Sequence, residues 1–184
     1  MEDLLEIKHL HIEGFYENQW QPIVRDISLT LKRGEVLGLI GESGAGKSTI
    51  GLAAMGYTRQ GCRLAKGSIK IEGSQLFGAD EEDLRLIRGS KIAYVAQSAA
   101  ASFNPSHKVI RQYAEAPVQH GIMSYSEAEK AAFKIYERLF LPNPEKIGYR
   151  YPHELSGGQL QRAMVAMSMS CKPDIIVFDE PTTA

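Results

Sequence analysis

The sequence predicts an α/β fold, and three observations lead to that prediction. The first third of the 184 residues alternates short strand-like apolar runs with turns. From about Ser98 to Ser170, apolar residues recur mostly at helical spacing. Residues 174–179 then return to a short apolar run that ends in a carboxylate. Strands, a helical stretch and a further strand are typical of layered α/β proteins.

Composition excludes several classes of protein. Lysine and arginine number 21 and aspartate and glutamate 22, a balance that argues against a bulk nucleic-acid or membrane-surface binder. The two cysteines, Cys62 and Cys171, have no zinc-site spacing and form no disulfide framework. The first residues lack a basic segment followed by an apolar one, and no apolar run approaches the roughly 20 residues that span a bilayer. We therefore expect a soluble protein of the cytoplasm.

The strands are expected in the following order. Residues 5–12 alternate apolar and polar positions, and residues 23–31 do so with an interruption near Asp26. Residues 35–40 are apolar without alternation, which predicts a strand buried on both faces of a parallel sheet. Short strands are also expected over residues 68–71 and 92–96, the second of which leads to Gln97.

Helix signals follow from capping residues and apolar spacing. Asp80 before three carboxylates predicts a helix start, and Gly89 predicts its end. Ser124 and Glu127 form the pattern of a capping box. The methionines in these helices are expected to pack in the core. Helical stripes are formed by Ile50, Ala53 and Ala54; by Ala128, Ala132, Ile135 and Leu139; and by Leu160, Ala163, Met164, Met167 and Cys171.

Residues 41–48 read Gly-Glu-Ser-Gly-Ala-Gly-Lys-Ser and match the pattern of a phosphate-binding P-loop. The glycines allow backbone N–H groups to turn onto phosphates, and the following helix start adds partial positive charge. Lys47 supplies a cation for the β- and γ-phosphates, and the Ser48 hydroxyl can bind Mg²⁺. The expected nucleotide contacts are Gly41, Ser43, Gly44, Ala45, Gly46, Lys47, Ser48 and Thr49.

Two adjacent carboxylates end the last predicted strand. Ligands of open α/β sheets bind beyond the carboxyl ends of strands, where Asp179 lies. Asp179 would orient the metal, and Glu180 would polarise the attacking water as a general base. The simpler alternative is a solvated acidic pair before the turn at Pro181.

Residues 155–159 read Leu-Ser-Gly-Gly-Gln, without change the signature of the ABC ATPases. Together with the P-loop, Gln97 and the strand before Asp179, they make the chain resemble that family over nearly its whole length. The resemblance implies a P-loop NTPase fold: a RecA-like core with an antiparallel β flank, over residues 1–97 and 172–184. It also implies an inserted helical subdomain over about 98–171, with ATP and Mg²⁺ as cofactors and the C-terminal part of the domain absent.

The same resemblance gives roles to further residues. Gln97 corresponds to a glutamine that touches Mg²⁺ or the attacking water, so catalysis would rest on Glu180, Lys47 and Gln97, and the metal on Ser48, Gln97 and Asp179. Ser156 can cap the following helix; in the family, the signature binds the ATP of a second domain, which implies such contacts for Ser156, Gly158 and Gln159. The aromatic side chain that stacks on adenine is Phe15, Tyr16 or Trp20, of which we favour Tyr16.

A closer resemblance is to the ATP-binding subunits of dipeptide, oligopeptide and nickel importers. It rests on residues 34–44, on Ser-Phe-Asn-Pro at 102–105 and on residues 151–158, although 98–101 lack the usual acidic residue and proline. It implies ATP hydrolysis that energises import, at the cytoplasmic face of the inner membrane as a peripheral subunit. The partners would be a second ATPase domain, permease subunits and, indirectly, a solute-binding protein, with no nucleic acid.

Two other functions stay open at this point. One is an ABC-type ATPase that acts on DNA or ribosomes, against which the short span from Gln97 to Ser156, the two cysteines and the net charge all argue. The other is a nucleotide-binding module with little turnover. It is suggested by the end of the chain before the family's later motifs, from which we expect a fragment of a longer product.

Overall fold

The computed structural model describes residues 3–180, which form two compact units that meet in sequence between Ile87 and Arg88. Each unit is described by itself. Residues 181–184, which the expected core lobe includes, lie outside the described residues. The expected division into a core lobe and an inserted helical lobe stays a prediction.

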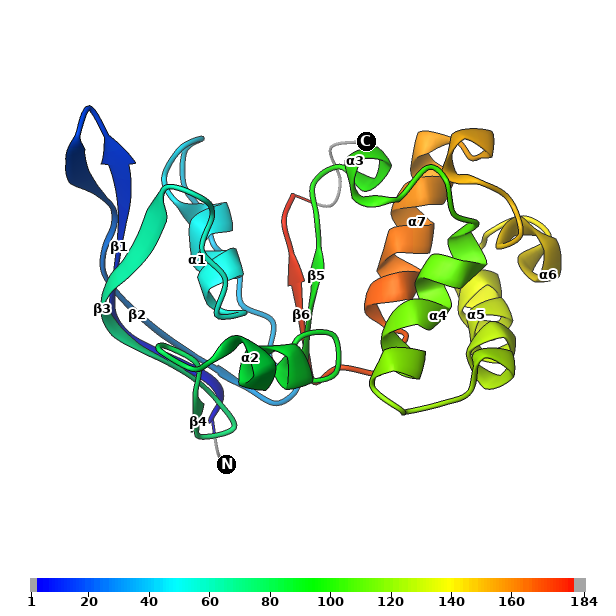
Figure 1. Ribbon diagram of the computed structural model, residues 1–184, viewed down its shortest axis with the longest axis horizontal. Helices are drawn as coiled ribbons and strands as arrows, with labels where there is room; N and C mark the ends of the chain where they lie inside the picture. The colour runs from blue at the N-terminus through cyan, green and yellow to red at the C-terminus, as the bar shows by residue number, and fades with distance from the viewer. Residues whose placement is uncertain (1–2, 181–184) are drawn as a thin grey trace. The chain divides into compact units, whose positions relative to one another are not determined.

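The first unit is built on an antiparallel four-stranded sheet with the order β2-β1-β3-β4 (Figure 1). Three of its strands contain the predicted runs over residues 5–12, 23–31 and 68–71, and each is longer than the run it contains. The expected antiparallel sheet is thus present in this unit. The strands are β1 (Asp3–Tyr16), β2 (Gln19–Lys32), β3 (Cys62–Ile71) and β4 (Ser74–Gln75).

The interruption expected near Asp26 is a bulge shared by β1 and β2. His9 and Asp26 both have positive φ values, 48° and 52°, and the two side chains are joined by a 2.7 Å contact between His9 Nδ1 and Asp26 Oδ1. Opposite the bulge on β3, Gly67 has a φ of 107°, and a Cβ atom there would lie 2.6 Å from the His9 carbonyl oxygen. Only glycine fits at that position because the bulge brings the two backbones together.

The prediction of a buried strand over residues 35–40 is wrong. This segment belongs to neither sheet of the described residues, and Val36 and Ile40 are 99% and 100% exposed. A strand needs a neighbour that pairs with its backbone N–H and C=O groups. No described strand pairs with this segment, so its apolar residues form a loop instead of a buried strand.

Two short helices complete the first unit and lie on the same side of its sheet (Figure 1). Helix α1 (Lys47–Ala53) buries Ile50 and Ala53 of the expected stripe, and its third member, Ala54, is buried directly after the helix. Helix α2 (Glu81–Ile87) begins where predicted, because Asp80 Oδ1 accepts a 2.9 Å hydrogen bond from the backbone N–H of Asp83.

The second unit contains two parallel strands and a set of helices. Strands β5 (Ile92–Val95) and β6 (Ile175–Phe178) pair in parallel, with Ile92 opposite Ile175 and Val95 opposite Phe178. The predicted helical stretch is confirmed. Its helices are α3 (Ala99–Ser102), α4 (Val109–Gln119), α5 (Tyr125–Arg138), α6 (Pro144–Ile147), the short 3-10 helix η1 (Pro152–Glu154) and α7 (Gly157–Ser168).

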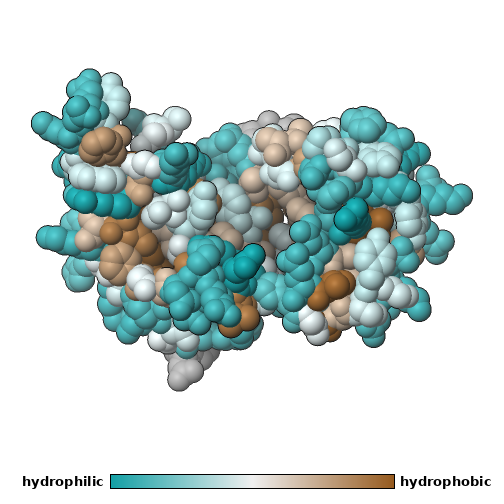
Figure 2. Space-filling model, viewed as in Figure 1, coloured by the Kyte–Doolittle hydropathy of each residue, from teal (hydrophilic) through white to brown (hydrophobic). Residues whose placement is uncertain are grey.

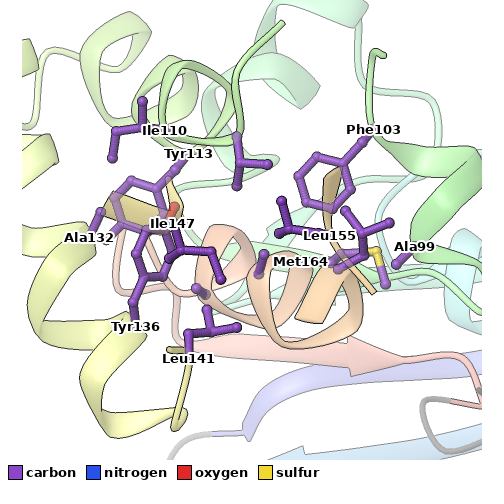
Figure 3. Packing of buried hydrophobic residues seen from close by; sticks show 14 of the residues in the cluster. Ala99, Phe103, Ile110, Tyr113, Ala132, Tyr136, Leu141, Ile147, Leu155 and Met164 are labelled. Atoms are coloured by element: carbon purple, nitrogen blue, oxygen red, sulfur yellow. The ribbon is translucent and has the colours of Figure 1, made fainter. Parts of the chain in front are cut away.

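The core of the second unit lies between α4, α5 and α7 (Figure 3). Tyr113 and Tyr136 face one another edge to face, with ring centroids 5.9 Å apart, and Met164 packs in the same cluster, as expected for a core methionine. Burial raises the pKa of Tyr113 to about 12 and that of Tyr136 further. At the start of α5, Ser124 and Glu127 form the predicted capping box.

A buried glutamine fixes the loop between α3 and α4. The Gln112 side chain accepts from the backbone N–H of Asn104 at 2.8 Å and donates to the carbonyls of Asn104 and His107 at 3.1 and 2.9 Å. We expect Gln112→Leu to lower the free energy of unfolding by about 2 kcal/mol, because backbone groups lose their partners in a buried place. Urea unfolding measures this. The exposed Gln119→Leu is the control, and equal losses for both would contradict the role of Gln112.

The face seen in Figure 2 is mostly hydrophilic, with smaller hydrophobic patches. Within residues 3–180, none of the helices combines the length and the apolar character that crossing a membrane requires.

Candidate functional site

The loop over residues 41–48 curls around its own lysine. Lys47 Nζ donates two 2.8 Å hydrogen bonds, to the backbone carbonyls of Gly41 and Glu42. The turn is closed by a 3.2 Å hydrogen bond from Ala45 N–H to the Glu42 carbonyl. Gly44 takes a φ of 83°, a conformation in which side chains are strained. The ammonium group is therefore held by the loop that is expected to hold phosphates.

The first turn of α1 has no side-chain cap. Its N-cap residue is Gly46, which has a φ of 86°. A Cβ atom there would lie 3.1 Å from Val24 Cγ2 and 3.4 Å from the Ile23 carbonyl oxygen. Because no side chain caps this helix, the first backbone N–H groups of α1 can donate hydrogen bonds to an anion. Lys47, Ser48 and Thr49 begin this turn, and all three are half-buried.

Two of the three candidate aromatic residues pack against each other. The rings of Phe15 and Trp20 have centroids 5.1 Å apart. The guanidinium carbon of Arg63 lies 4.1 Å from the centroid of Trp20, and Glu13 holds the same guanidinium group through hydrogen bonds of 2.7 and 2.9 Å. One face of Trp20 is thus already covered by a cation.

Tyr16 lies on the face of the β1–β2 hairpin that is opposite to Phe15, on the side of the loop over residues 41–48. A Cβ atom on Gly14 would lie 2.8 Å from Ile23 Cδ1, and one on Gly46 would lie 3.7 Å from Ile23 Cγ2. Because side chains alternate along a strand, Tyr16 shares the face of Gly14 and is opposite to Phe15. Tyr16 is 63% exposed. Of the three candidates, Tyr16 is the one on the side of the loop.

The second unit brings together the predicted carboxylates and Gln97. The backbone N–H of Asp179 donates to the Val95 carbonyl at 2.9 Å, which continues the pairing of β6 with β5. Gln97 Nε2 donates to Glu180 Oε2 at 3.1 Å. Glu180 has a φ of 47°, so the chain leaves the strand direction there. Side chains that lie 83 positions apart in the sequence thus meet at the carboxyl ends of two parallel strands.

Sequence reasoning missed one residue of this cluster. The Tyr94 hydroxyl donates a 2.6 Å hydrogen bond to Asp179 Oδ2. In the sequence, Tyr94 counts only as one apolar member of a strand. The signal that could have found it is the register of β5 and β6, which the sequence does not give.

The signature segment begins α7 with a complete capping box. Ser156 Oγ accepts from the Gln159 N–H at 3.3 Å, and Gln159 Oε1 accepts from the Ser156 N–H at 3.0 Å, so the predicted cap is confirmed. Gly157 and Gly158 are exposed, and a Cβ atom on Gly157 would have no neighbour within 4 Å. The backbone of Gly157 and Gly158, in the first turn of α7, is therefore open to solvent.

The predicted site residues fall into two groups. Tyr16 and residues 41–49 belong to the first unit, and Gln97, Ser156, Gly158, Gln159, Asp179 and Glu180 belong to the second. In the first unit, the structure places the Lys47 ammonium group within the loop over residues 41–48. In the second unit, it places Gln97 next to Glu180. The metal ligand set of Ser48, Gln97 and Asp179 draws on both units and stays a prediction, as do the nucleotide contacts of all these residues.

Comparison with known sequences identifies the family to which the chain is similar. The family model described as ABC transporter matches residues 24–183. The oligopeptide transport ATP-binding protein OppD of Lactococcus lactis is 36% identical over 183 residues, which are 100% of this chain and 54% of that protein. The metal-staphylopine import system ATP-binding protein CntD of Staphylococcus aureus is 40% identical over 98% of this chain and 66% of its own length. The chain thus spans about half the length of the Lactococcus relative.

Comparison with solved structures gives the same kind of protein. A dimeric ATP-binding cassette in a post-hydrolysis state, bound to ADP and Pi, superposes with a TM-score of 0.85 at 25% identity. The match covers 98% of this chain and 75% of the cassette. An ATP-binding subunit of an ABC transporter superposes with a TM-score of 0.76 at 26% identity, over 98% of this chain and 67% of its own.

Proposed function

The chain belongs to the ABC transporter family, and we propose that it is an ATP-hydrolysing subunit that energises the import of peptides or similar small solutes through a membrane permease. Its fold is the expected α/β fold of a P-loop NTPase, that of the cassettes it superposes on. The names of the relatives support the proposal, since they include oligopeptide, glutathione and metal-staphylopine importers. The observation that carries it is the cluster of Gln97, Asp179 and Glu180 at the ends of β5 and β6.

The residues fit ATP and Mg²⁺. The uncapped start of α1 and the Lys47 ammonium group supply donors and positive charge for phosphates. The Ser48 hydroxyl, the Gln97 amide oxygen and the Asp179 carboxylate are oxygen ligands of the kind Mg²⁺ prefers, and these three residues would hold the ion. When bound, the ion would neutralise charge on the β- and γ-phosphates.

In the reaction, Glu180 acts as the general base. Its carboxylate accepts a hydrogen bond from Gln97 through one oxygen, Oε2. The other carboxylate oxygen then accepts a proton from the water that attacks the γ-phosphate in line. Gln97 fixes the Glu180 side chain and orients the same water. Lys47 stabilises the charge that the leaving phosphate oxygens acquire.

The adenine base is expected to stack on Tyr16. We expect Tyr16→Ala to weaken ATP binding about tenfold, because stacking of a base on an aromatic ring contributes roughly 1–3 kcal/mol. Phe15→Ala is the matched control, since Phe15 packs on Trp20 on the opposite face of the hairpin. Fluorescence titration with a labelled ATP measures both. The assignment of Tyr16 is wrong when Phe15→Ala weakens binding more than Tyr16→Ala.

A second ATPase domain is the proposed partner of the signature segment. The exposed glycines and the N-terminus of α7 offer N–H groups and a helix dipole to an anion, and Ser156, Gly158 and Gln159 would bind the γ-phosphate of the partner's ATP. Dimeric cassettes among the similar structures support this arrangement. The permease would hold the subunit at the cytoplasmic face of the inner membrane, with a solute-binding protein as an indirect partner.

The test is uptake of a labelled oligopeptide by cells that lack the gene and carry either the wild type or the Glu180→Gln variant. We expect uptake with the wild type alone, together with phosphate release from ATP by the purified protein. Phosphate release without any gain in peptide uptake would contradict the proposal that the transported solute is a peptide, but it would still support ATP hydrolysis. Absence of both would contradict the function as a whole.

A further inference from the structure

We propose that Tyr94 is a positioning residue for Asp179, whose carboxylate its hydroxyl group holds in the orientation that binds the metal ion. This inference rests on the proposed function and deepens it. It adds a residue that none of the sequence motifs contains. Its basis is the 2.6 Å hydrogen bond from the Tyr94 hydroxyl to Asp179 Oδ2.

The register of the two strands brings these side chains together. Tyr94 on β5 lies opposite Val177 on β6, and Asp179 follows Val177 by two positions. Side chains two positions apart share a face, so Tyr94 and Asp179 are diagonal neighbours. A tyrosine side chain is long enough to reach its diagonal neighbour and has a hydroxyl donor at its end. An aliphatic side chain has no hydrogen-bond donor. The backbone N–H of Asp179 also bonds to β5, at Val95, so main chain and side chain of Asp179 are held by the same strand.

The chemistry of the donor suits a metal carboxylate. A hydrogen bond from the hydroxyl group to Oδ2 restricts the orientation of the carboxylate. The donor is neutral, so it adds no positive charge that would repel a divalent cation, as a lysine or arginine would. Residues that hydrogen-bond to metal ligands typically raise metal affinity by this kind of orientation.

The two adjacent carboxylates have separate donors. The Tyr94 hydroxyl bonds to Asp179, and the Gln97 amide bonds to Glu180. Tyr94→Phe therefore removes a hydrogen bond to the metal carboxylate and leaves the hydrogen bond from Gln97 to the general base in place. A purely structural tie between β5 and β6 is the competing explanation, and it makes no prediction about the metal.

The experiment removes only the hydroxyl group. Affinity for a fluorescent ATP is measured at increasing Mg²⁺ concentration, and the midpoint is the concentration that gives half of the gain in affinity. In Tyr94→Phe, we expect this midpoint to rise about tenfold or more. Affinity for the same nucleotide in EDTA stays unchanged. The electron paramagnetic resonance spectrum of bound Mn²⁺ gives a second readout and is expected to change. Tyr149→Phe is the matched control, because it removes a hydroxyl that donates a 2.6 Å hydrogen bond to Glu129, away from the site.

Each outcome decides the question. Equal Mg²⁺ dependence in the wild type and Tyr94→Phe overturns the inference, even when the variant unfolds at a lower temperature. Loss of nucleotide affinity in EDTA overturns it as well. In an Asp179→Asn background, Tyr94→Phe should have no further effect on the metal, and an additive effect contradicts action through Asp179. A wild type that binds no nucleotide contradicts the proposed function itself, and the inference falls with it.

Discussion

Replacing Glu180 by glutamine is expected to lower the rate of ATP hydrolysis by about 10²–10⁴-fold, the usual contribution of a general base. Glutamine has nearly the same shape as glutamate, and its amide oxygen can still accept the hydrogen bond from Gln97 Nε2 that now reaches Glu180 Oε2. The hydrogen bond with Gln97 is therefore kept, whereas the ability to take a proton is lost. Phosphate release at saturating Mg²⁺ and ATP measures the rate, and ATP affinity is expected to change by less than about threefold.

The control is Glu137→Gln, which neutralises an exposed carboxylate on α5. Its hydrolysis rate should match that of the wild type. A Glu180→Gln variant that still hydrolyses ATP at more than a tenth of the wild-type rate would contradict the assignment of Glu180 as the base. A variant that loses ATP binding would instead indicate a structural role for the carboxylate.

The parts of the fold that depend on neighbours in sequence could be predicted. The capping boxes at Ser124 and Ser156 involve residues three positions apart, so the pattern alone contains both partners. The N-cap at Asp80 is equally local. The phosphate loop is similar, since Lys47 bonds to carbonyls five and six residues before it. In each case, the sequence segment holds all the groups that determine the structure.

Features that depend on pairing between distant segments were not predictable in the same way. Residues 35–40 have the composition of a buried strand, but composition does not provide the neighbouring strand that a sheet requires. The contact of Tyr94 with Asp179 follows from the register of β5 and β6. The sequence favours Tyr16 among three aromatic residues, but the structural reason for preferring it to Phe15 is the face of the β1–β2 hairpin that lies near Ile23, which depends on strand pairing.

Replacing Lys47 by alanine is expected to weaken ATP binding about 100-fold, because charge-assisted hydrogen bonds contribute roughly 1.5–3 kcal/mol each. The ammonium group already lies within the loop, held by the carbonyls of Gly41 and Glu42, so little ordering is needed when phosphates arrive. The same substitution should leave adenosine affinity unchanged, because adenosine has no phosphates. Titrations with ATP and with adenosine separate the two contributions.

Lys8→Ala is the matched control, since Lys8 is an exposed lysine of the same unit, paired with Glu6 at 2.6 Å. Its ATP affinity should equal that of the wild type, because exposed ion pairs contribute little. Equal losses for ATP and adenosine in Lys47→Ala would mean that the loop had collapsed, since the Lys47 bonds to Gly41 and Glu42 also hold the free loop in shape. ATP binding within twofold of the wild type would contradict the phosphate site, because no other cation of the loop over residues 41–48 could replace Lys47.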